Sequence, residues 1–165
     1  MISEFNSLPE LDEIDIRLLQ FLQTDASISN QDLAAKVHIS PPTCLRRVKR
    51  LRDLELIERQ VAVLNTDRLK STIGAGLTAI VEVTLTEQTE EVIAAFENRS
   101  MNENAVQQCY RVSPGPDLIL IAQVRDMSAY LQLAQQLFTQ DAKVRNVKAF
   151  FSIKRTKFST GLAWL

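Results

Sequence analysis

The sequence predicts an α+β protein with a helical N-terminal domain and a C-terminal domain built on a four-stranded sheet. Apolar residues up to about Glu58 recur at helical spacing. From Leu77 onward, apolar strands and helices follow one another in the order βαββαβ, the ferredoxin-like pattern. Gly74 and Gly76 mark the stretch between these two regions. We therefore expect domains at 1–62 and 77–165, joined by a connector at 63–76.

Three helices are predicted in the N-terminal domain, and a short turn joins the last two. Asp12 is the expected cap of the first helix, and Ser29, with Asp32 three residues later, is the cap of the second. Ser40 followed by Pro41 begins the third helix. This arrangement predicts a helix-turn-helix. Apolar and polar residues then alternate over 57–63, which predicts a strand or hairpin and hence a winged domain.

The C-terminal domain is expected to contain strands at 77–85, 105–113, 117–124 and 144–157, and helices at 89–99 and 127–140. If both helices lie on one face of the sheet, the opposite face needs a cover, and a second subunit is the simplest one. Val81, Val83 and Ile121 are predicted on that open face. Four aromatic residues are interpreted as packing groups of a subunit interface: Phe150, Phe151, Phe158 and Trp164.

Basic residues are concentrated in two segments, although the net charge is only −1. Residues 40–52 and 143–165 each contain several arginines and lysines and no acid. In the third predicted helix, a core stripe of Cys44, Val48 and Leu51 leaves the opposite face basic and polar. Guanidinium groups there suit guanine edges or phosphates, and a helix-turn-helix places this helix in the major groove of double-stranded DNA. The expected DNA contacts are Ser29, Asn30, Gln31, Ser40, Pro42, Thr43, Arg46, Arg47, Lys49 and Arg50. The competing interpretation is a solvated surface helix.

Other chemistry-bearing residues have plain structural interpretations. His38 is expected in a surface turn, and Cys44 and Cys109 are expected to be buried thiols. The basic C-terminal strand is interpreted as a solvated edge, with a role in holding wrapped DNA as the alternative. The sequence contains no nucleophile–base pair, no nucleotide-binding glycine motif and no metal cluster. We therefore expect neither an enzyme nor a cofactor or metal.

Three stretches resemble the N-terminal domain of the leucine-responsive regulatory protein/AsnC (Lrp/AsnC) family. They are residues 11–15 (LDEID), 29–34 (SNQDLA) and 40–51 (SPPTCLRRVKRL). Val112, Ser113 and Asp117, with the segment 126–130, resemble the effector-binding domain of the same family. The resemblance implies a transcription regulator that dimerises through its ferredoxin-like domains, assembles further, commonly into octamers, and binds small amino acids between dimers.

The resemblance also shows where this chain departs from the family pattern. The family usually has glycine at the positions of His38 and Glu55, and histidine tolerates a left-handed conformation better than most residues. In the effector region, proline stands at 114 and leucine at 118 where the family has glycine and tyrosine, and Ala149 stands where threonine is common. Tyr110 is assigned either to the pocket or to the core. The effector-binding residues that the resemblance implies are Tyr110, Ser113, Pro114, Gly115, Asp117, Leu118 and Ala149.

Taken together, the sequence predicts a sequence-specific DNA-binding regulator whose oligomeric packing responds to a small amino acid, with leucine or methionine favoured. An architectural DNA-binding protein without an effector is the alternative, and an enzyme on a ferredoxin-like domain is a weaker one. No segment approaches the ~20 apolar residues of a membrane span, and the N-terminus lacks the pattern of a signal peptide. A cytoplasmic location is therefore expected.

Overall fold

The structure, a computed structural model, describes residues 10–73 and 76–163. The chain divides into two compact units. One comprises the chain up to Val63 together with the segment from Lys157 onward, and the other comprises Leu64–Thr156. Within the described ranges, no helix has both the length and the apolar character needed to cross a membrane.

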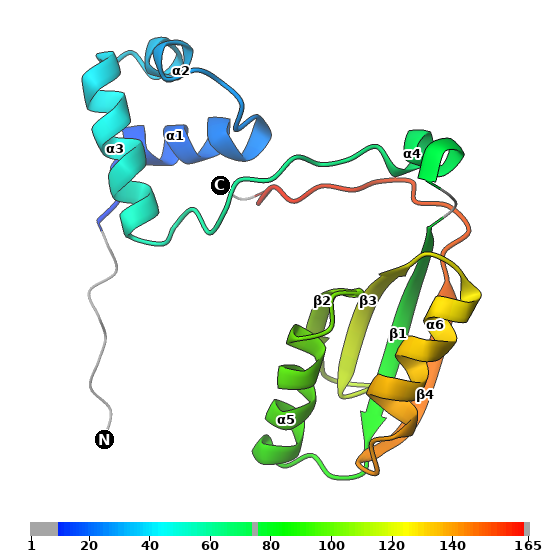
Figure 1. The fold of residues 1–165 in the computed structure, drawn as a ribbon. Coiled ribbons are helices and arrows are strands. Elements are labelled where there is room, and N and C mark those ends of the chain that lie inside the picture. The colour runs from blue at the N-terminus through cyan, green and yellow to red at the C-terminus, as the bar shows by residue number, and fades with distance from the viewer. Residues whose placement is uncertain (1–9, 74–75, 164–165) are drawn as a thin grey trace, which may run out of the picture. The chain divides into compact units, whose positions relative to one another are not determined.

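The first unit contains the three predicted helices, α1 (Glu13–Thr24), α2 (Asn30–Lys36) and α3 (Pro41–Asp53) (Figure 1). The predicted caps are confirmed: the side chains of Asp12, Ser29 and Ser40 each accept the backbone N–H three residues later. These caps satisfy amides that the first turn of each helix leaves unpaired. The helices enclose a core of side chains that are at most 7% exposed: Leu18, Leu33, Ala34, Val37, Cys44, Val48 and Leu51.

The C-terminal segment of the first unit is hydrogen-bonded to α1. The Gln23 side chain donates to the carbonyl of Leu162 at 3.3 Å and accepts the N–H of Leu162 at 2.8 Å. This pair of bonds anchors residues from Lys157 onward to the helical unit, although the sequence had placed them in the C-terminal domain.

The predicted strand or hairpin at 57–63 is wrong. The described segment between α3 and Asn65 contains no strand, and Val61 and Val63 are 67% and 61% exposed. A strand exists only when its backbone pairs with a neighbour, and alternating side chains alone do not supply one. The first unit is therefore a helix-turn-helix without a wing in this structure.

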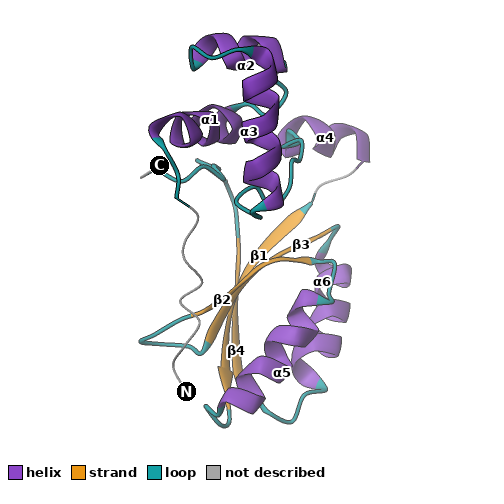
Figure 2. Ribbon diagram, turned by 90° about the vertical axis from the view of Figure 1, so that its left-hand side faces the viewer, coloured by secondary structure: helices purple, strands orange, loops and turns teal. Residues whose placement is uncertain are grey.

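The second unit is an antiparallel four-stranded sheet in the order β2-β3-β1-β4. Its strands are β1 (Leu77–Leu85), β2 (Val106–Arg111), β3 (Leu118–Val124) and β4 (Val144–Phe151). Helices α5 (Glu90–Met101) and α6 (Met127–Ala134) cover one face of the sheet, and Figure 2 shows the other face without a helix. The ferredoxin-like prediction is confirmed. The side chains of Thr89 and Asp126 cap α5 and α6.

Two of the three residues predicted on the open face of the sheet lie on the other face. Val81 and Val83 are fully buried beneath the helices, together with Leu118 and Leu120. Ile121 lies opposite Ile80 and does face the open side, because directly paired residues share a face. The prediction for β1 was displaced by one residue, and a shift of one residue along a strand moves every side chain to the opposite face of the sheet. The apolar side chains on the open face are Ile80, Tyr110, Ile119, Ile121 and Phe150.

Several element ends also differ from the predicted ones. The predicted connector contains a helix, α4 (Thr66–Ile73). The predicted helix at 127–140 consists of α6 followed by a π-helical turn, Gln135–Thr139. The last strand ends at Phe151, not near 157, and Ile153 beyond it is fully exposed. Of the predicted interface aromatics, Phe151 packs within the chain against Tyr130, and Trp164 lies outside the described residues.

Candidate nucleic-acid interface and ligand-binding region

The turn between α2 and α3 is held by a Schellman motif. The N–H of His38 donates to the carbonyl of Ala35, and the N–H of Ile39 donates to the carbonyl of Ala34. His38 has φ 58°, the left-handed conformation that glycine usually occupies at this position. Asn30 then ties the start of α2 to α3 through a bond to the carbonyl of Pro41 at 2.9 Å. The two helices are thereby fixed as a helix-turn-helix.

A second Schellman motif ends α3. Glu55 has φ 57°, its N–H donates to the carbonyl of Arg52, and the N–H of Leu56 donates to the carbonyl of Leu51. Both positions at which the Lrp/AsnC family usually has glycine are therefore left-handed in this chain. Histidine and glutamate adopt this conformation at a cost of about 1–2 kcal/mol each relative to glycine.

Two of the predicted DNA-binding arginines are paired with carboxylates of α1. Arg47 Nη1 lies 2.7 Å from Asp12 Oδ2 and 2.9 Å from Asp15 Oδ1. Arg50 Nη1 lies 2.9 Å from Asp15 Oδ2, and its Nη2 donates to the carbonyl of Glu10. The backbone N–H of Asp15 and then the Arg47 guanidinium lower the pKa of Asp12. This cluster locks α3 against the start of α1.

The basic side chains that stay free are Arg46 and Lys49. Both are exposed, and neither has a hydrogen-bond or ion-pair partner among residues 10–73 and 76–163. They lie on one face of α3 with Pro42 and Leu45, because residues spaced by three, four and seven positions share a helix face. Leu45 is 61% exposed and was not among the predicted contacts. The sequence did contain a signal for this exposure, because Leu45 lies outside the apolar stripe of Cys44, Val48 and Leu51 that faces the core.

The remaining predicted DNA contacts gather around the starts of α2 and α3. Ser29 and Ser40 are caps, and the Ser40 hydroxyl also lies 2.8 Å from the Thr43 hydroxyl. Gln31 is exposed on the first turn of α2. The predicted residues therefore lie at the starts of α2 and α3 and, for Arg46 and Lys49, on the outer face of α3, whereas Arg47 and Arg50 are paired with carboxylates at the start of α1.

In the second unit, the predicted ligand residue Asp117 is buried and fully engaged. Its Oδ2 accepts the N–H of Leu85 at 2.7 Å, and its Oδ1 accepts Gln88 Nε2 at 2.7 Å. Only 8% of Asp117 is exposed. The carboxylate therefore joins the turn before β3 to the end of β1, and its two oxygens have partners without a ligand.

The other predicted effector residues do not line one pocket within the chain. Ser113, Pro114 and Gly115 are exposed in the turn before β3. Leu118 is fully buried beneath the helices, and Ala149 lies on the same covered face of β4. Tyr110 is 51% exposed on the open face of β2, at the other edge of the sheet. Tyr110 was assigned either to the pocket or to the core, and its exposure excludes a position in the core of this chain.

Metal-site geometry is absent from the described part of the chain, which contains no group of three or more His, Cys, Asp or Glu side chains able to hold an ion. Cys44 is buried and Cys109 half-buried, and burial raises the pKa of both thiols.

A helix-turn-helix with free cations on its third helix, followed by a ferredoxin-like domain, defines a DNA-binding protein with a separate regulatory domain.

Comparison with known proteins agrees with this class. Residues 11–52 match the AsnC-type helix-turn-helix domain, and residues 78–162 match the Lrp/AsnC ligand binding domain. The chain belongs to the Lrp/AsnC family of transcriptional regulators, as its resemblance to that family implied. It therefore carries a DNA-binding domain and a ligand-binding domain, and its relatives are regulators, not enzymes.

Individual relatives cover nearly the whole chain. The leucine-responsive regulatory protein of Escherichia coli K12 is 33% identical over 153 residues, covering 93% of this chain and 91% of that protein. The Bkd operon transcriptional regulator of Pseudomonas aeruginosa is 33% identical over 147 residues, covering 89% and 94%. An AsnC family regulator from Agrobacterium tumefaciens has a similar structure, with TM-score 0.80, 26% identity, and 92% and 96% coverage. A Neisseria meningitidis regulator solved as its L-methionine complex has TM-score 0.79, 26% identity, and 93% and 96% coverage.

Proposed function

We propose that this protein is a sequence-specific regulator that binds double-stranded DNA through α3 and changes its assembly when a small amino acid binds. The observation that carries the DNA half of this proposal is the pair of unpartnered cations, Arg46 and Lys49, on the outer face of α3. Because the carboxylates of α1 already neutralise Arg47 and Arg50, those two arginines position α3 and do not read bases.

The contact surface in this proposal is the start of α3 with its outer face. Arg46 is placed for a guanine edge, Lys49 for a phosphate, and Ser40, Pro42 and Thr43 for the groove at the N-terminal turn. Ser29, Asn30 and Gln31 would meet phosphate at the start of α2, where free amides point outward. Leu45 extends this surface, because an exposed apolar side chain between cations fits the methyl group of thymine.

A second copy of the chain is the partner that fits the open face of the sheet. Ile80, Tyr110 and Phe150 are 38%, 51% and 50% exposed there, and the charged neighbours Glu82 and Lys148 lie close to each other on the same face. Pairing two such faces buries the apolar residues and presents two copies of α3 to successive major grooves. We therefore propose a homodimer, assembling to an octamer, with an operator that is an imperfect palindrome. Its proposed site of action is the cytoplasm.

The amino-acid half of the proposal is supported by the ligand-binding domain match and by two relatives. One neighbour was solved with L-methionine, and one relative is named for its response to leucine. Leucine and methionine are therefore the leading candidates. A ligand at ~100 times its dissociation constant adds about 2.7 kcal/mol of stability, so a melting screen of all amino acids is sensitive enough to detect it.

Two neighbouring arginines test the DNA surface. DNA selected by the full-length protein from a random pool serves as the operator. Arg46→Ala should weaken binding roughly 10- to 100-fold with no change in stability, as loss of a bidentate base contact does. Arg47→Ala should instead lower stability, because it leaves Asp15 short of one cation. If Arg46→Ala binds with wild-type affinity, the assignment of the outer face of α3 to DNA is wrong.

Salt and thymine methyl groups give two further readouts. Affinity should fall steeply with salt, because each neutralised phosphate releases counterions. Replacing one operator thymine by uracil should weaken wild-type binding about threefold to tenfold, because the thymine methyl group is lost. The same replacement should not change the affinity of Leu45→Ala. Leu56→Ala, at another exposed leucine, is the control and should respond as the wild type does. If no amino acid changes melting or DNA affinity, the architectural alternative replaces the effector half of the proposal.

A further inference from the structure

Two carboxylates at the start of α1 hold two arginines of α3 by the same few atoms. Asp15 is 1% exposed and accepts from Nη1 of Arg47 and from Nη1 of Arg50, each at 2.9 Å. Asp12 accepts from the same Nη1 of Arg47 at 2.7 Å. The two positive charges of the arginines are thus matched by two negative charges inside the first unit.

The carboxylates, and not the surrounding packing, hold Arg47 in this position. Its Nε is buried and has no hydrogen-bond partner among the described residues. An unpaired buried N–H group is costly, so the arginine stays inward only because the carboxylates attract it. The Arg47 side chain is already 25% exposed. Without the carboxylates, its guanidinium group would gain by turning outward.

Arg50 lies at the edge of the face that carries the free cations. It follows Arg46 by four positions, and residues four apart are neighbours on a helix surface. Its side chain is 45% exposed even while it is paired. Without the Asp15 carboxylate, the guanidinium group of Arg50 can therefore join Arg46 and Lys49 at the surface assigned to DNA.

Extra free arginines at this surface favour non-specific DNA over an operator. Phosphates are the same in every sequence, and their contacts supply nearly all of non-specific binding, whereas base-edge contacts discriminate. On an operator, the base contacts fix α3 in one position, and a released arginine finds a phosphate only if that position allows it. On other sequences, α3 settles wherever its cations meet phosphates. Release of Arg47 and Arg50 would therefore lower the ratio of operator affinity to non-specific affinity.

We propose that Asp12 and Asp15 are specificity-determining residues, which occupy Arg47 and Arg50 and so keep both arginines from the phosphates of non-specific DNA. The inference rests on the proposed function, in which the outer face of α3 binds DNA. Neither carboxylate touches DNA, so both act through the arginines. The competing interpretation is a cluster that only holds α3 against α1 and has no influence on the choice of sequence.

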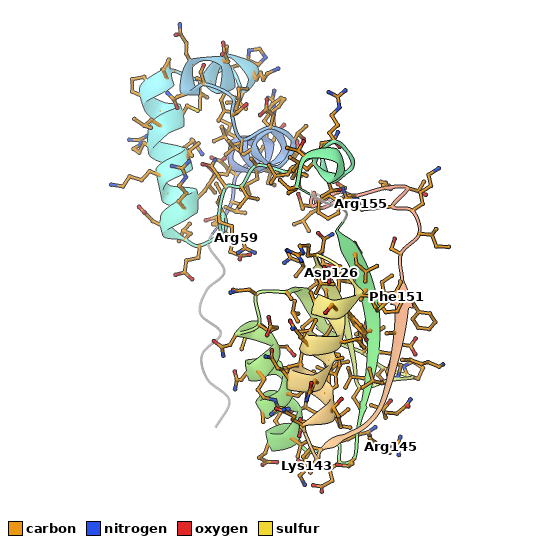
Figure 3. All side chains as sticks on the ribbon, turned by 45° about the vertical axis from the view of Figure 1, so that its right-hand side comes forward. Arg59, Asp126, Lys143, Arg145, Phe151 and Arg155 are labelled. Carbon is orange, nitrogen blue, oxygen red and sulfur yellow. The ribbon has the colours of Figure 1, made fainter. Side chains whose placement is uncertain are left out.

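An exposed ion pair in the same unit gives the contrast. Figure 3 labels Arg59 in the segment that follows α3, where its Nε lies 3.5 Å from Glu58 Oε1. The two side chains are 74% and 83% exposed, and an ion pair this exposed contributes little. Burial of the Asp15 carboxylate is what allows the α1–α3 cluster to withhold arginines from another acceptor.

The test removes the charge of each carboxylate and keeps the shape of its side chain. Asp12→Asn removes one charge, and asparagine caps a helix as well as aspartate does, so α1 keeps its cap. Asp15→Asn removes the charge that both arginines share. Each full-length variant is titrated with the operator selected by the wild-type protein and with a scrambled duplex of the same length, over a series of salt concentrations.

Both variants should bind the scrambled duplex more tightly than the wild type does, by roughly threefold for Asp12→Asn and tenfold for Asp15→Asn. The plot of log affinity against log salt concentration should steepen by about 0.9 for each arginine that gains a phosphate. The ratio of operator affinity to scrambled-duplex affinity should fall. A purely structural cluster predicts the opposite result, namely weaker binding to both duplexes without a steeper salt dependence.

Matched variants separate the pairing from the charge itself. Glu13→Gln removes an exposed acid from the same turn of α1, and Glu58→Gln removes the acid of the exposed pair. Both should retain the wild-type salt dependence and affinity ratio. Asp12→Asn should also have no effect when it is introduced into Arg47→Ala, because the arginine that it releases is gone. Circular dichroism checks the fold of each variant, and Asp12→Asn decides alone if Asp15→Asn does not fold.

The outcomes distinguish this inference from the proposed function. If the wild-type protein prefers its operator and Asp12→Asn changes neither the salt dependence nor the affinity ratio, the inference is overturned and the DNA-binding function stands. If Glu13→Gln has the same effect as Asp12→Asn, nearby charge and not the pairing is responsible, and the inference is again overturned. If the wild-type protein binds operator and scrambled duplex equally, sequence-specific binding fails and the inference fails with it.

Discussion

Among the residues that the structure describes, each unit buries one carboxylate, and the two are neutralised differently. Asp15 is 1% exposed and receives the guanidinium groups of Arg47 and Arg50. Asp117 is 8% exposed and receives a backbone N–H from Leu85 and an amide N–H from Gln88, with no cation among its described partners. The first site pairs charges between two helices, whereas the second hydrogen-bonds a turn to the end of a strand.

The difference teaches which charged residues already have partners within the chain. Arg47 and Arg50 were predicted to face DNA, and Asp117 was predicted to face a ligand. In the structure all three are engaged inside their own unit, because a buried carboxylate without partners is costly. Among the described residues, the groups that remain for outside partners are those whose neighbours leave them unpaired, such as Arg46 and Lys49.

Removing the charge-paired carboxylate should have the largest effect. Asp15→Ala leaves two guanidinium groups facing a partly buried space and should lower the free energy of unfolding by about 2–4 kcal/mol. Urea denaturation followed by circular dichroism measures this loss. Asp53→Ala removes an exposed acid of α3 and should change stability by less than about 0.5 kcal/mol. Equal effects of the two variants would mean that the Asp15 cluster does not hold α1 against α3.

Removing the hydrogen-bonded carboxylate should have the next largest effect. Asp117→Ala leaves the N–H of Leu85 buried without an acceptor, at a cost of about 1–3 kcal/mol. Thermal melting without any amino acid should already be lowered. Asp117→Asn keeps an acceptor and should lose less. An unchanged melting temperature for Asp117→Ala, combined with a lost amino-acid response, would return Asp117 to the ligand site.

Removing one partner at a time sharpens the comparison. Arg50→Ala should cost about 1–2 kcal/mol, because hydrogen bonds to charged groups contribute more than neutral ones and Asp15 keeps only one cation. Gln88→Ala should cost about 0.5–1.5 kcal/mol, because the Leu85 N–H still holds one oxygen of Asp117. Raising the salt concentration should reduce the Arg50→Ala effect and leave the Gln88→Ala effect unchanged. If salt changed the stability loss of both variants equally, the Asp15 and Asp117 sites would not differ in the way proposed.

The smallest expected effect is on the titration of Asp12. Its pKa lies below the ordinary 3.8, first through the N–H of Asp15 and then through Arg47. The stability it contributes is therefore present above pH 3.8 and lost as the pH falls through the lower, folded value. In Arg47→Ala the pKa should move toward 3.8 without reaching it, because the N–H of Asp15 remains. NMR titration of the side-chain carboxyl measures the shift, and an unmoved pKa would contradict the pairing.

Local signals were sufficient for most of the fold. The caps Asp12, Ser29 and Ser40 could be predicted from the sequence, because the first turn of a helix leaves backbone amides that a side-chain acceptor just before it can satisfy. The order of strands and helices followed from a change in apolar period. The basic outer face of α3 was also readable, because its apolar stripe identifies the face that is buried.

Non-local partners were needed for everything else. The alternation at 57–63 matched a strand, but no described segment pairs with it, and the face of β1 followed from its register with β3 and β4. The chain alone identified where charge would be found: the cations of α3, Asp117 and the basic C-terminal segment. Three-dimensional packing assigned the use of each charge, because a charged side chain turns outward or inward according to the opposite charges and amides that the fold brings within hydrogen-bonding distance. Those neighbours, such as Asp15 for Arg47 or Gln88 for Asp117, lie about 30 residues away along the chain.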